Sequence, residues 1–247
     1  MSYKSFTLVG ANGLLENIPV LVLTRKTSDS SSNIPASSNI KITKVDYEDS
    51  AEISAILKEN NVEVIISAVK TVPGGKSQYA LADSTKAVGV KLFVSSEFRN
   101  VTAGSSLTVY KEKGDFAKYL KKIRFPSARI YMGVFFVYIP VLVGYHIDQK
   151  FNIVGKGQMK ASFSALEDIG GFVAHIVTHL SADQLNDKIF RLQSRGFDAC
   201  GAHCQSDLAE SFLATMQGLI EGGEGSTGWD YEINEESAER AGSANTL

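Results

Sequence analysis

Short apolar runs alternate with helical patterns along the first 132 residues, and this alternation constrains the fold more than any other feature of the chain. Strands that are separated by helices form a parallel sheet with helices packed on its faces. The expected strands are Ser5–Val9, Val20–Thr24, Lys41–Asp46, Val64–Val69, Lys91–Ser95 and Ala128–Met132. The expected helices are Ser50–Asn60, Lys76–Val88 and Lys113–Lys122. The pattern predicts an α/β fold of the Rossmann type, with a doubly wound parallel sheet.

The first of these helices also has a candidate start signal. Ser50 stands just before apolar residues at helical spacing, and a serine side chain can accept hydrogen bonds from the free N–H groups of a helix. We therefore expect Ser50 to be the N-cap.

The pattern changes after Met132. An apolar stretch, Phe135–Gly144, contains Pro140 and is not expected to form one continuous helix. The later expected elements are a helix at Asp168–Leu180, a strand at Ile189–Leu192 and a helix at Ser206–Leu219. From Glu221 the chain is rich in Gly, Glu and Ser, which is typical of weak order. The expected organisation is a nucleotide-binding core at 1–132, a region at 133–220 that completes the fold, and a tail at 221–247.

Composition narrows the classes of function. The chain has 247 residues, 44% of them hydrophobic, which is enough for a substantial core, and its net charge of −2 gives no basic field for a nucleic acid. It contains no run of 18 apolar residues that would span a membrane, and its N-terminal apolar stretch is too short for a signal peptide. We expect a cytoplasmic protein that contacts neither nucleic acid nor membrane.

The cysteines and histidines do not predict a metal site. Cys200 and Cys204 flank His203, but no second pair stands at zinc-site spacing, so two free thiols fit better than a metal site or a disulfide. His175 and His179 share a helix face, a spacing that can bind metal, but without a nearby acid or cysteine helix packing or surface exposure explains the pair better.

A glycine-containing turn follows the first expected strand. In a dinucleotide-binding fold this turn lets the pyrophosphate approach the backbone, and a helix then begins so that its N–H groups meet the phosphate. Gly10-Ala11-Asn12-Gly13 has this position, so Gly10, Asn12 and Gly13 are candidate phosphate contacts, although a purely structural turn explains a lone pair of glycines nearly as well.

The connection that follows is unusually short. Only ten residues, Gly10–Pro19, separate the first two strands, whereas a crossover with its helix needs at least about 10–12. Fully extended, ten residues reach about 33 Å, which allows a return beside one strand but leaves no length for several helical turns. Glu16 also stands where a third glycine would open the helix. We expect the first crossover helix to be shortened or absent.

Arg25 and Lys26 follow the second strand, where this fold reads the adenosine ribose. An acidic residue there favours NAD, and an arginine favours the additional 2′-phosphate of NADP. The pair therefore indicates binding of NADP(H). The alternative is that Arg25 and Lys26 are a solvated basic pair at the start of a loop.

Together these segments resemble the NmrA-like family, which includes fungal NmrA-type regulators and plant isoflavone and phenylcoumaran benzylic ether reductases. The resemblance spans most of the chain, and Val94-Ser95-Ser96-Glu97-Phe98 is its most specific block; the tail resembles fungal members. The other matching segments are Gly10-Ala11-Asn12-Gly13, Leu23-Thr24-Arg25, Gln78 with Leu81, Gly89–Phe93, Gly133-Val134-Phe135-Phe136 and Glu167-Asp168-Ile169-Gly170.

The resemblance implies a site. In the reductases a lysine that opens the helix after the fifth strand is the catalytic acid/base, and Lys113 takes that position here. Ser67, Ala68 and Val69 would pass the cofactor, Ser95 and Ser96 would flank the nicotinamide, and Phe136 would line the nicotinamide or substrate pocket. Tyr110 precedes Lys113 by three residues, one short of the Tyr-x3-Lys spacing of typical short-chain dehydrogenases, so that dyad is not expected.

Departures from the family keep three functions open. The third glycine is missing, Arg99 replaces a small residue, and the segment from Gly196 to Cys204 does not follow the family. The first function is an NADPH-dependent reductase of a small aromatic substrate. The second is a non-catalytic, NADP-responsive regulator with a protein partner, and the third is a degenerate member that has lost cofactor binding.

Overall fold

The computed structural model describes residues 3–9, 19–27, 39–69, 77–105, 107–153, 161–192, 217, 219–220, 225–227, 229–230 and 235–236. The main sheet contains β1 (Phe6–Val9), β2 (Val20–Arg25), β3 (Ile40–Val45), β4 (Val64–Ser67), β5 (Leu92–Val94), β6 (Ser127–Tyr131) and β9 (Lys188–Arg191). The helices are α1 (Ser50–Glu59), α2 (Ser77–Ala87), α3 (Thr108–Lys122), α4 (Ile139–Leu142), α5 (Tyr145–Asp148), α6 (Leu166–His179) and α7 (Ala182–Leu185), with a 3-10 helix, η2 (Phe136–Tyr138). Short strands β7 (Val134–Phe135), β8 (Phe163–Ser164), β10 (Trp229–Asp230) and β11 (Glu235–Glu236) form two further sheets.

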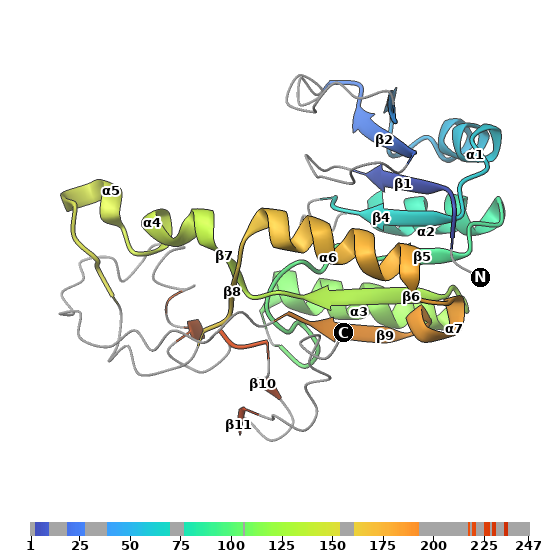
Figure 1. Cartoon of the computed structure of the whole chain (residues 1–247). Coiled ribbons are helices and arrows are strands. Elements are labelled where there is room, and N and C mark those ends of the chain that lie inside the picture. The colour runs from blue at the N-terminus through green and yellow to red at the C-terminus, as the bar shows by residue number, and fades with distance from the viewer. Residues whose placement is uncertain are drawn as a thin grey trace. The chain divides into compact units, whose positions relative to one another are not determined.

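The order of the main sheet is β3-β2-β1-β4-β5-β6-β9 (Figure 1). Strands β1 to β6 pair in parallel, and the register aligns Leu8 of β1 with Val22 of β2 and Ile66 of β4. The chain thus moves outward from β1 to β3 and then returns to β4 on the other side of β1. This is the doubly wound α/β fold that the alternating pattern predicts.

The chain divides into two compact units, each built from separated segments. The first unit comprises Met1–Glu97, Ser106–Arg129 and Glu167–Ile189, and the second comprises Phe98–Ser105, Ile130–Leu166 and Phe190–Leu247. The contiguous division into 1–132, 133–220 and 221–247 stays a prediction.

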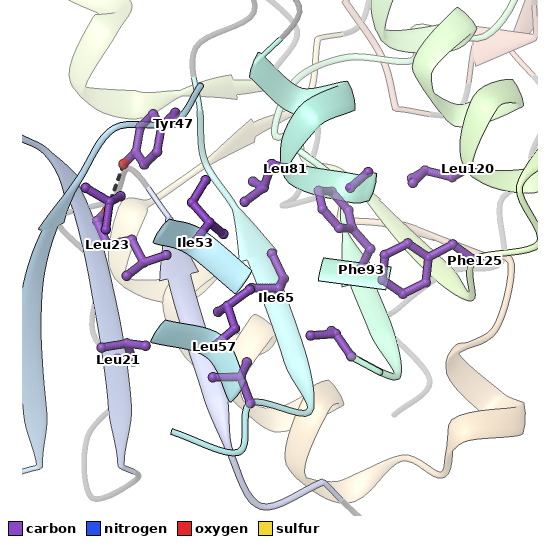
Figure 2. Close-up of a cluster of buried hydrophobic side chains, with 14 of the residues drawn as sticks. Leu21, Leu23, Tyr47, Ile53, Leu57, Ile65, Leu81, Phe93, Leu120 and Phe125 are labelled. Carbon is purple, nitrogen blue, oxygen red and sulfur yellow. Dashed lines mark hydrogen bonds between the residues drawn. The ribbon is translucent and has the colours of Figure 1, made fainter. Parts of the chain in front are cut away.

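One face of the sheet in the first unit is covered by α1, α2 and α3. Alternate residues of the strands, such as Leu21, Ile65 and Phe93, pack there against side chains of these helices (Figure 2). The helices contribute Ile53 and Leu57 from α1, Leu81 and Ala82 from α2, and Phe116 and Leu120 from α3. The helical spacing of these apolar residues is therefore what attaches the three helices to the sheet.

The opposite face of the sheet is buried as well. Phe6, Val22 and Ile66, which alternate with residues of the first face, are each 2% exposed. Helix α6 crosses the sheet on this side in Figure 1 and buries Ile169, Val173, Ile176 and Val177. The strands therefore read as continuous apolar runs because they are covered on both faces.

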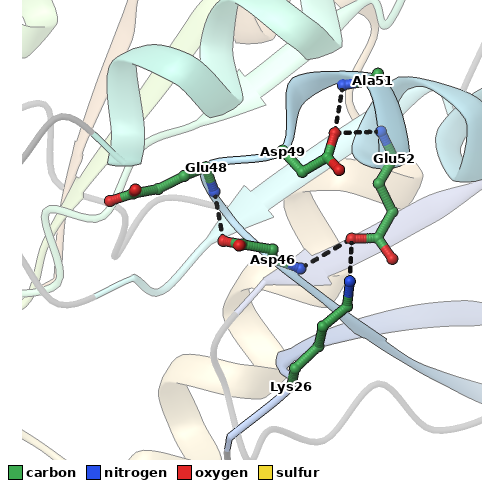
Figure 3. Close-up of polar contacts among 6 residues, drawn as sticks. All are labelled: Lys26, Asp46, Glu48, Asp49, Ala51 and Glu52. Atoms are coloured by element: carbon green, nitrogen blue, oxygen red, sulfur yellow. Dashed lines mark hydrogen bonds and ion pairs between the residues drawn. The ribbon is translucent and has the colours of Figure 1, made fainter.

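The N-cap of helix α1 is one residue earlier than the expected Ser50. The N-cap is Asp49, whose carboxylate accepts hydrogen bonds from the N–H groups of Ala51 and Glu52 at 3.0 and 2.9 Å (Figure 3). Ser50 is instead the first helical residue, so the expected N-cap was wrong. The carboxylate satisfies two free N–H groups and places a negative charge at the positive end of the helix.

The segment between β1 and β2 lies outside the described residues. The two strands are parallel neighbours, as expected, and the ten residues from Gly10 to Pro19 join them. The expectation of a shortened or absent crossover helix stays a prediction.

In the second unit, the stretch Phe135–Gly144 divides as Pro140 predicts. It forms η2 and the short α4, with Pro140 in the first turn of α4. Gly133 has a φ of +72°, and a Cβ there would lie 1.9 Å from the carbonyl oxygen of Ser162, so the β7–β8 pairing requires glycine at this position.

Within the segment 221–247, for which the composition predicts weak order, the residues Gly225–Thr227 are buried. The Thr227 N–H donates to Ser162 Oγ at 3.0 Å, and Arg191 donates to the Thr227 carbonyl at 2.8 Å. Polar side chains contribute to holding this short stretch, and a hydropathy pattern does not reveal such bonds.

The N-cap assignment can be tested by two neighbouring substitutions. Asp49→Ala removes the acceptor for two helix N–H groups, so we expect the free energy of unfolding in urea to fall by about 1 kcal/mol. Ser50→Ala is the matched control and should change it by less than about 0.5 kcal/mol. A larger loss for Ser50→Ala than for Asp49→Ala would contradict this assignment.

Candidate functional site

The strand order places the candidate site at the carboxyl ends of the central strands. The order reverses between β1 and β4, and open α/β sheets bind ligands outside the carboxyl ends of the strands at such a reversal. The residues that end β4 and follow β5 are therefore the first to consider.

Ser67 and Ser95 occupy these positions side by side. Ile66 of β4 pairs with Val94 of β5. Ser67 and Ser95 each directly follow one residue of this pair, so they are neighbours across the two strands. They are 0% and 2% exposed, and neither hydroxyl has a hydrogen-bond partner among the described residues. A buried hydroxyl without a partner costs free energy, and such groups concentrate where a ligand supplies the partner.

A third hydroxyl of this kind lies at the end of β2. Thr24 is 4% exposed, and its Oγ1 also lacks a partner within the described part of the chain. Thr24 belongs to the matching segment Leu23-Thr24-Arg25 but was not among the expected cofactor contacts. Its position next to Arg25, at the end of an apolar strand, was the available signal.

Lys113 of α3 reaches the same edge of the sheet. Its Nζ donates to the backbone carbonyl oxygen of Glu97 at 2.7 Å and to that of Ser96 as well. The lysine is only 7% exposed. These two bonds hold the ammonium group at the backbone that directly follows β5.

Ser96 and Val69 join the ends of β5 and β4. The Ser96 Oγ donates to the Val69 carbonyl oxygen at 2.8 Å, and Ala68 and Val69 are half-buried directly after β4. The structure thus brings together six of the residues that the sequence proposed, namely Ser67, Ala68, Val69, Ser95, Ser96 and Lys113.

The position of Lys113 within its helix differs from the expectation. Helix α3 begins at Thr108, so Lys113 lies in its second turn and does not open it. Tyr110, 3% exposed, is one of the buried residues of the first turn. The helix begins earlier because residues 108–112 continue a helical pattern that includes this buried position.

Arg25 and Lys26 lie together at the end of β2, and an acidic group faces them. Lys26 Nζ forms a 3.0 Å ion pair with Glu52 of α1, and the same carboxylate oxygen accepts the Asp46 N–H at 3.1 Å (Figure 3). The Asp46 N–H, followed by Lys26, lowers the pKa of Glu52, and the Glu52 carboxylate raises the pKa of Lys26. Both side chains are solvated, so this pair contributes little to stability.

Arg25 makes no ion pair within the described residues, and its side chain is exposed. It is close enough to Tyr47 for its charge to act on the phenol: burial raises the Tyr47 pKa to about 12, and Arg25 opposes that rise. Arg25 and Lys26 were both expected to bind the cofactor, with the arginine favouring the 2′-phosphate, and of the two Lys26 is the one engaged with Glu52.

The other proposed residues belong to the second unit or lie outside the described residues. Phe136 belongs to the second unit, where its ring stacks on Phe163 with 5.8 Å between centroids. Gly10, Asn12 and Gly13 lie outside the described residues, so their expected phosphate contacts stay predictions. No group of three or more metal-ligating side chains occurs within the described ranges, and none of the helices described there is long and apolar enough to cross a membrane.

Comparison with solved structures identifies the same architecture. A structure described as AtPrR2 with NADP+ and (+)pinoresinol is 16% identical, with a TM-score of 0.69 over 99% of this chain and 93% of that one. The binary complex of leucoanthocyanidin reductase with NADPH from Vitis vinifera is 21% identical, with a TM-score of 0.63 over 79% and 71% of the two chains. An isoflavone reductase is 17% identical, with a TM-score of 0.62 over 77% and 70%.

At these identities the likenesses establish the fold, which is that of a Rossmann-type α/β protein. Residues 7–194 match the sequence model of the NmrA-like family. This match covers well over half of the chain, and the chain belongs to the NmrA-like family. A search of the curated proteins finds no match.

The two serines after Val94 allow a test of whether the Ser95 hydroxyl lacks a structural partner at the carboxyl edge of the sheet. Ser95→Ala removes a buried hydroxyl that has no partner within the described residues, so the free energy of unfolding should stay unchanged or rise by up to ~1 kcal/mol. Ser96→Ala removes the bond to Val69 and should lower it by about 1 kcal/mol. Urea denaturation of both variants checks this contrast, and an equal loss in both would show that Ser95 has a structural partner.

Proposed function

We propose that this chain is an NADPH-dependent reductase of a small, aromatic molecule. The observation that carries the proposal is the buried ammonium group of Lys113, held by the backbone that directly follows β5, where Ser95 has a buried hydroxyl without a partner among the described residues. A positioned proton donor at the carboxyl edge of the sheet, where such folds bind ligands, is the arrangement that a reduction with proton transfer needs.

The residues at this edge fit a dinucleotide. Ser67, Ser95 and Thr24 offer buried hydroxyl groups whose hydrogen-bonding capacity the described residues do not use. Arg25 offers an exposed guanidinium at the end of β2, where its planar donors suit a ribose 2′-phosphate. The proteins of similar fold include some solved with NADPH or NADP+, which supports the same cofactor for this chain.

NADPH, when bound, supplies a hydride to the substrate. The residues of this chain do the remaining work: Lys113 gives a proton from Nζ to the atom that gains electron density, and the carbonyl oxygens of Ser96 and Glu97 fix that Nζ in place. The serine hydroxyls orient the reacting end of the cofactor. Pinoresinol, named with one similar structure, is a precedent for an aromatic substrate. The role implied for Phe136, lining the substrate pocket, stays a prediction.

Cofactor recognition is tested at Arg25. We expect Arg25→Ala to raise the Kd for NADPH about tenfold to a hundredfold in a fluorescence titration, as loss of a hydrogen-bonded charge pair costs ~1.5–3 kcal/mol. The Kd for NADH, which lacks the 2′-phosphate, should change little. Lys44→Ala, an exposed lysine on the neighbouring β3, is the control for charge alone.

Two results of the titration would contradict the proposal. Equal weakening of NADPH and NADH would mean that Arg25 does not read the 2′-phosphate. Absence of NADPH binding to the folded wild-type chain would favour a member of the family that has lost its cofactor.

Catalysis is tested at Lys113. In an NADPH-consumption assay over a panel of phenolic substrates, Lys113→Met should lower kcat by about 10²–10⁴-fold, with the NADPH Kd within about twofold of wild type. Lys118→Met is the control, because Lys118 lies on the same helix, is exposed and pairs with Asp115 at 3.0 Å. Circular dichroism verifies that each variant is folded.

The outcome of this assay separates the alternatives. Turnover that survives Lys113→Met would contradict the assigned role of the lysine. Stoichiometric NADPH binding by the wild-type chain, with no turnover over the panel, would instead indicate the non-catalytic regulator with a protein partner.

A further inference from the structure

We propose that His175 and His179 form a two-histidine binding site for a divalent transition-metal ion such as Zn²⁺ on helix α6. Both residues are exposed and stand one turn apart near the carboxyl end of this helix of 14 residues. The site is independent of the sheet edge that holds Lys113.

The two imidazole rings are already parallel and adjacent. Their centroids lie 4.3 Å apart and their planes differ by 18°. A tetrahedral Zn²⁺ with Zn–N bonds of about 2.0–2.1 Å needs its two nitrogens roughly 3.3 Å apart. The stacked rings do not direct both nitrogens at one ion, so binding requires side-chain rotations that turn the two nitrogens toward a common point.

The hydrogen bonds of His179 fix the tautomer that a metal ligand needs. Its Nδ1 lies 3.1 Å from the carbonyl oxygen of His175, which can only accept a hydrogen bond. It also lies 2.9 Å from Oγ1 of Thr178, which itself donates to the Ala174 carbonyl at 2.7 Å. The proton is therefore on Nδ1, and Nε2 carries a free lone pair.

This backbone contact matches the outer shell of known metal sites. A metal-bound histidine usually donates its other ring N–H to a carbonyl or carboxylate, which fixes the ring and makes the ligating nitrogen more basic. The carbonyl groups at the end of α6 add partial negative charge, which favours a cation there.

Histidine, aspartate, glutamate and cysteine supply no third ligand within the described residues. Water completes the coordination, which suits an imidazole-binding ion such as Zn²⁺, Ni²⁺ or Cu²⁺.

The test uses the full chain and diethylpyrocarbonate, which modifies unliganded imidazole nitrogens. Peptide mass spectrometry follows each histidine with and without Zn²⁺. We expect Zn²⁺ to slow modification of His175 and His179 at least fivefold, with no change at His146, an exposed histidine on α5 that serves as the internal control.

A single substitution distinguishes one shared site from two separate contacts. In the His175→Asn variant, Zn²⁺ should no longer protect His179, because the chelate has lost a ligand. Calorimetric titration of a Cys200→Ser, Cys204→Ser chain should show one Zn²⁺ site, whose affinity falls at least tenfold on His175→Asn. Protection of His146 to the same degree, continued protection of His179 in the variant, or no protection of either ring would overturn the proposal.

Discussion

The hydrogen bonds from Lys113 to the carbonyl oxygens of Ser96 and Glu97 are the interaction on which the candidate site depends. They attach helix α3 to the backbone that leaves β5, so the position of the ammonium group is set by the sheet. A buried lysine is tolerated only where its donors are satisfied, and here two of the three are used by the backbone.

The parallel register explains why the remaining groups gather at the same edge. Since Ile66 of β4 pairs with Val94 of β5, the two residues that follow this pair must lie side by side whatever their identity. Ser67 and Ser95 occupy those positions, and their hydroxyls have no hydrogen-bond partner among the described residues. The Ser96 hydroxyl, in contrast, donates to the carbonyl oxygen of Val69. The site therefore combines one group used for structure with others available to a ligand.

Much of this arrangement could be predicted from the sequence because it follows from periodicity. Apolar runs such as Val64–Ser67 are buried on both faces, and their ends mark the edge where ligands bind. What escaped prediction rests on single polar contacts. Asp49 rather than Ser50 caps α1, and Glu52 forms an ion pair with Lys26. An aspartate or glutamate near the start of a helix has several possible local partners, and the sequence pattern does not show which of them it contacts.

The start of α3 shows the same limit. Helical spacing located the helix but placed its beginning at Lys113, whereas the helix begins at Thr108. Five earlier residues extend the helix without a side-chain cap at Leu107, so no start signal was present to find. The lysine is nevertheless at the sheet edge, since its long side chain reaches back to the carbonyls of the preceding loop.

Amide hydrogen exchange with and without NADPH tests the central claim most directly. If the carboxyl ends of β4 and β5 form the cofactor site, NADPH should slow exchange in the segments that contain Ser67–Val69 and Ser95–Glu97. Saturating NADPH that slows exchange elsewhere, and leaves both of these segments unchanged, would contradict the account.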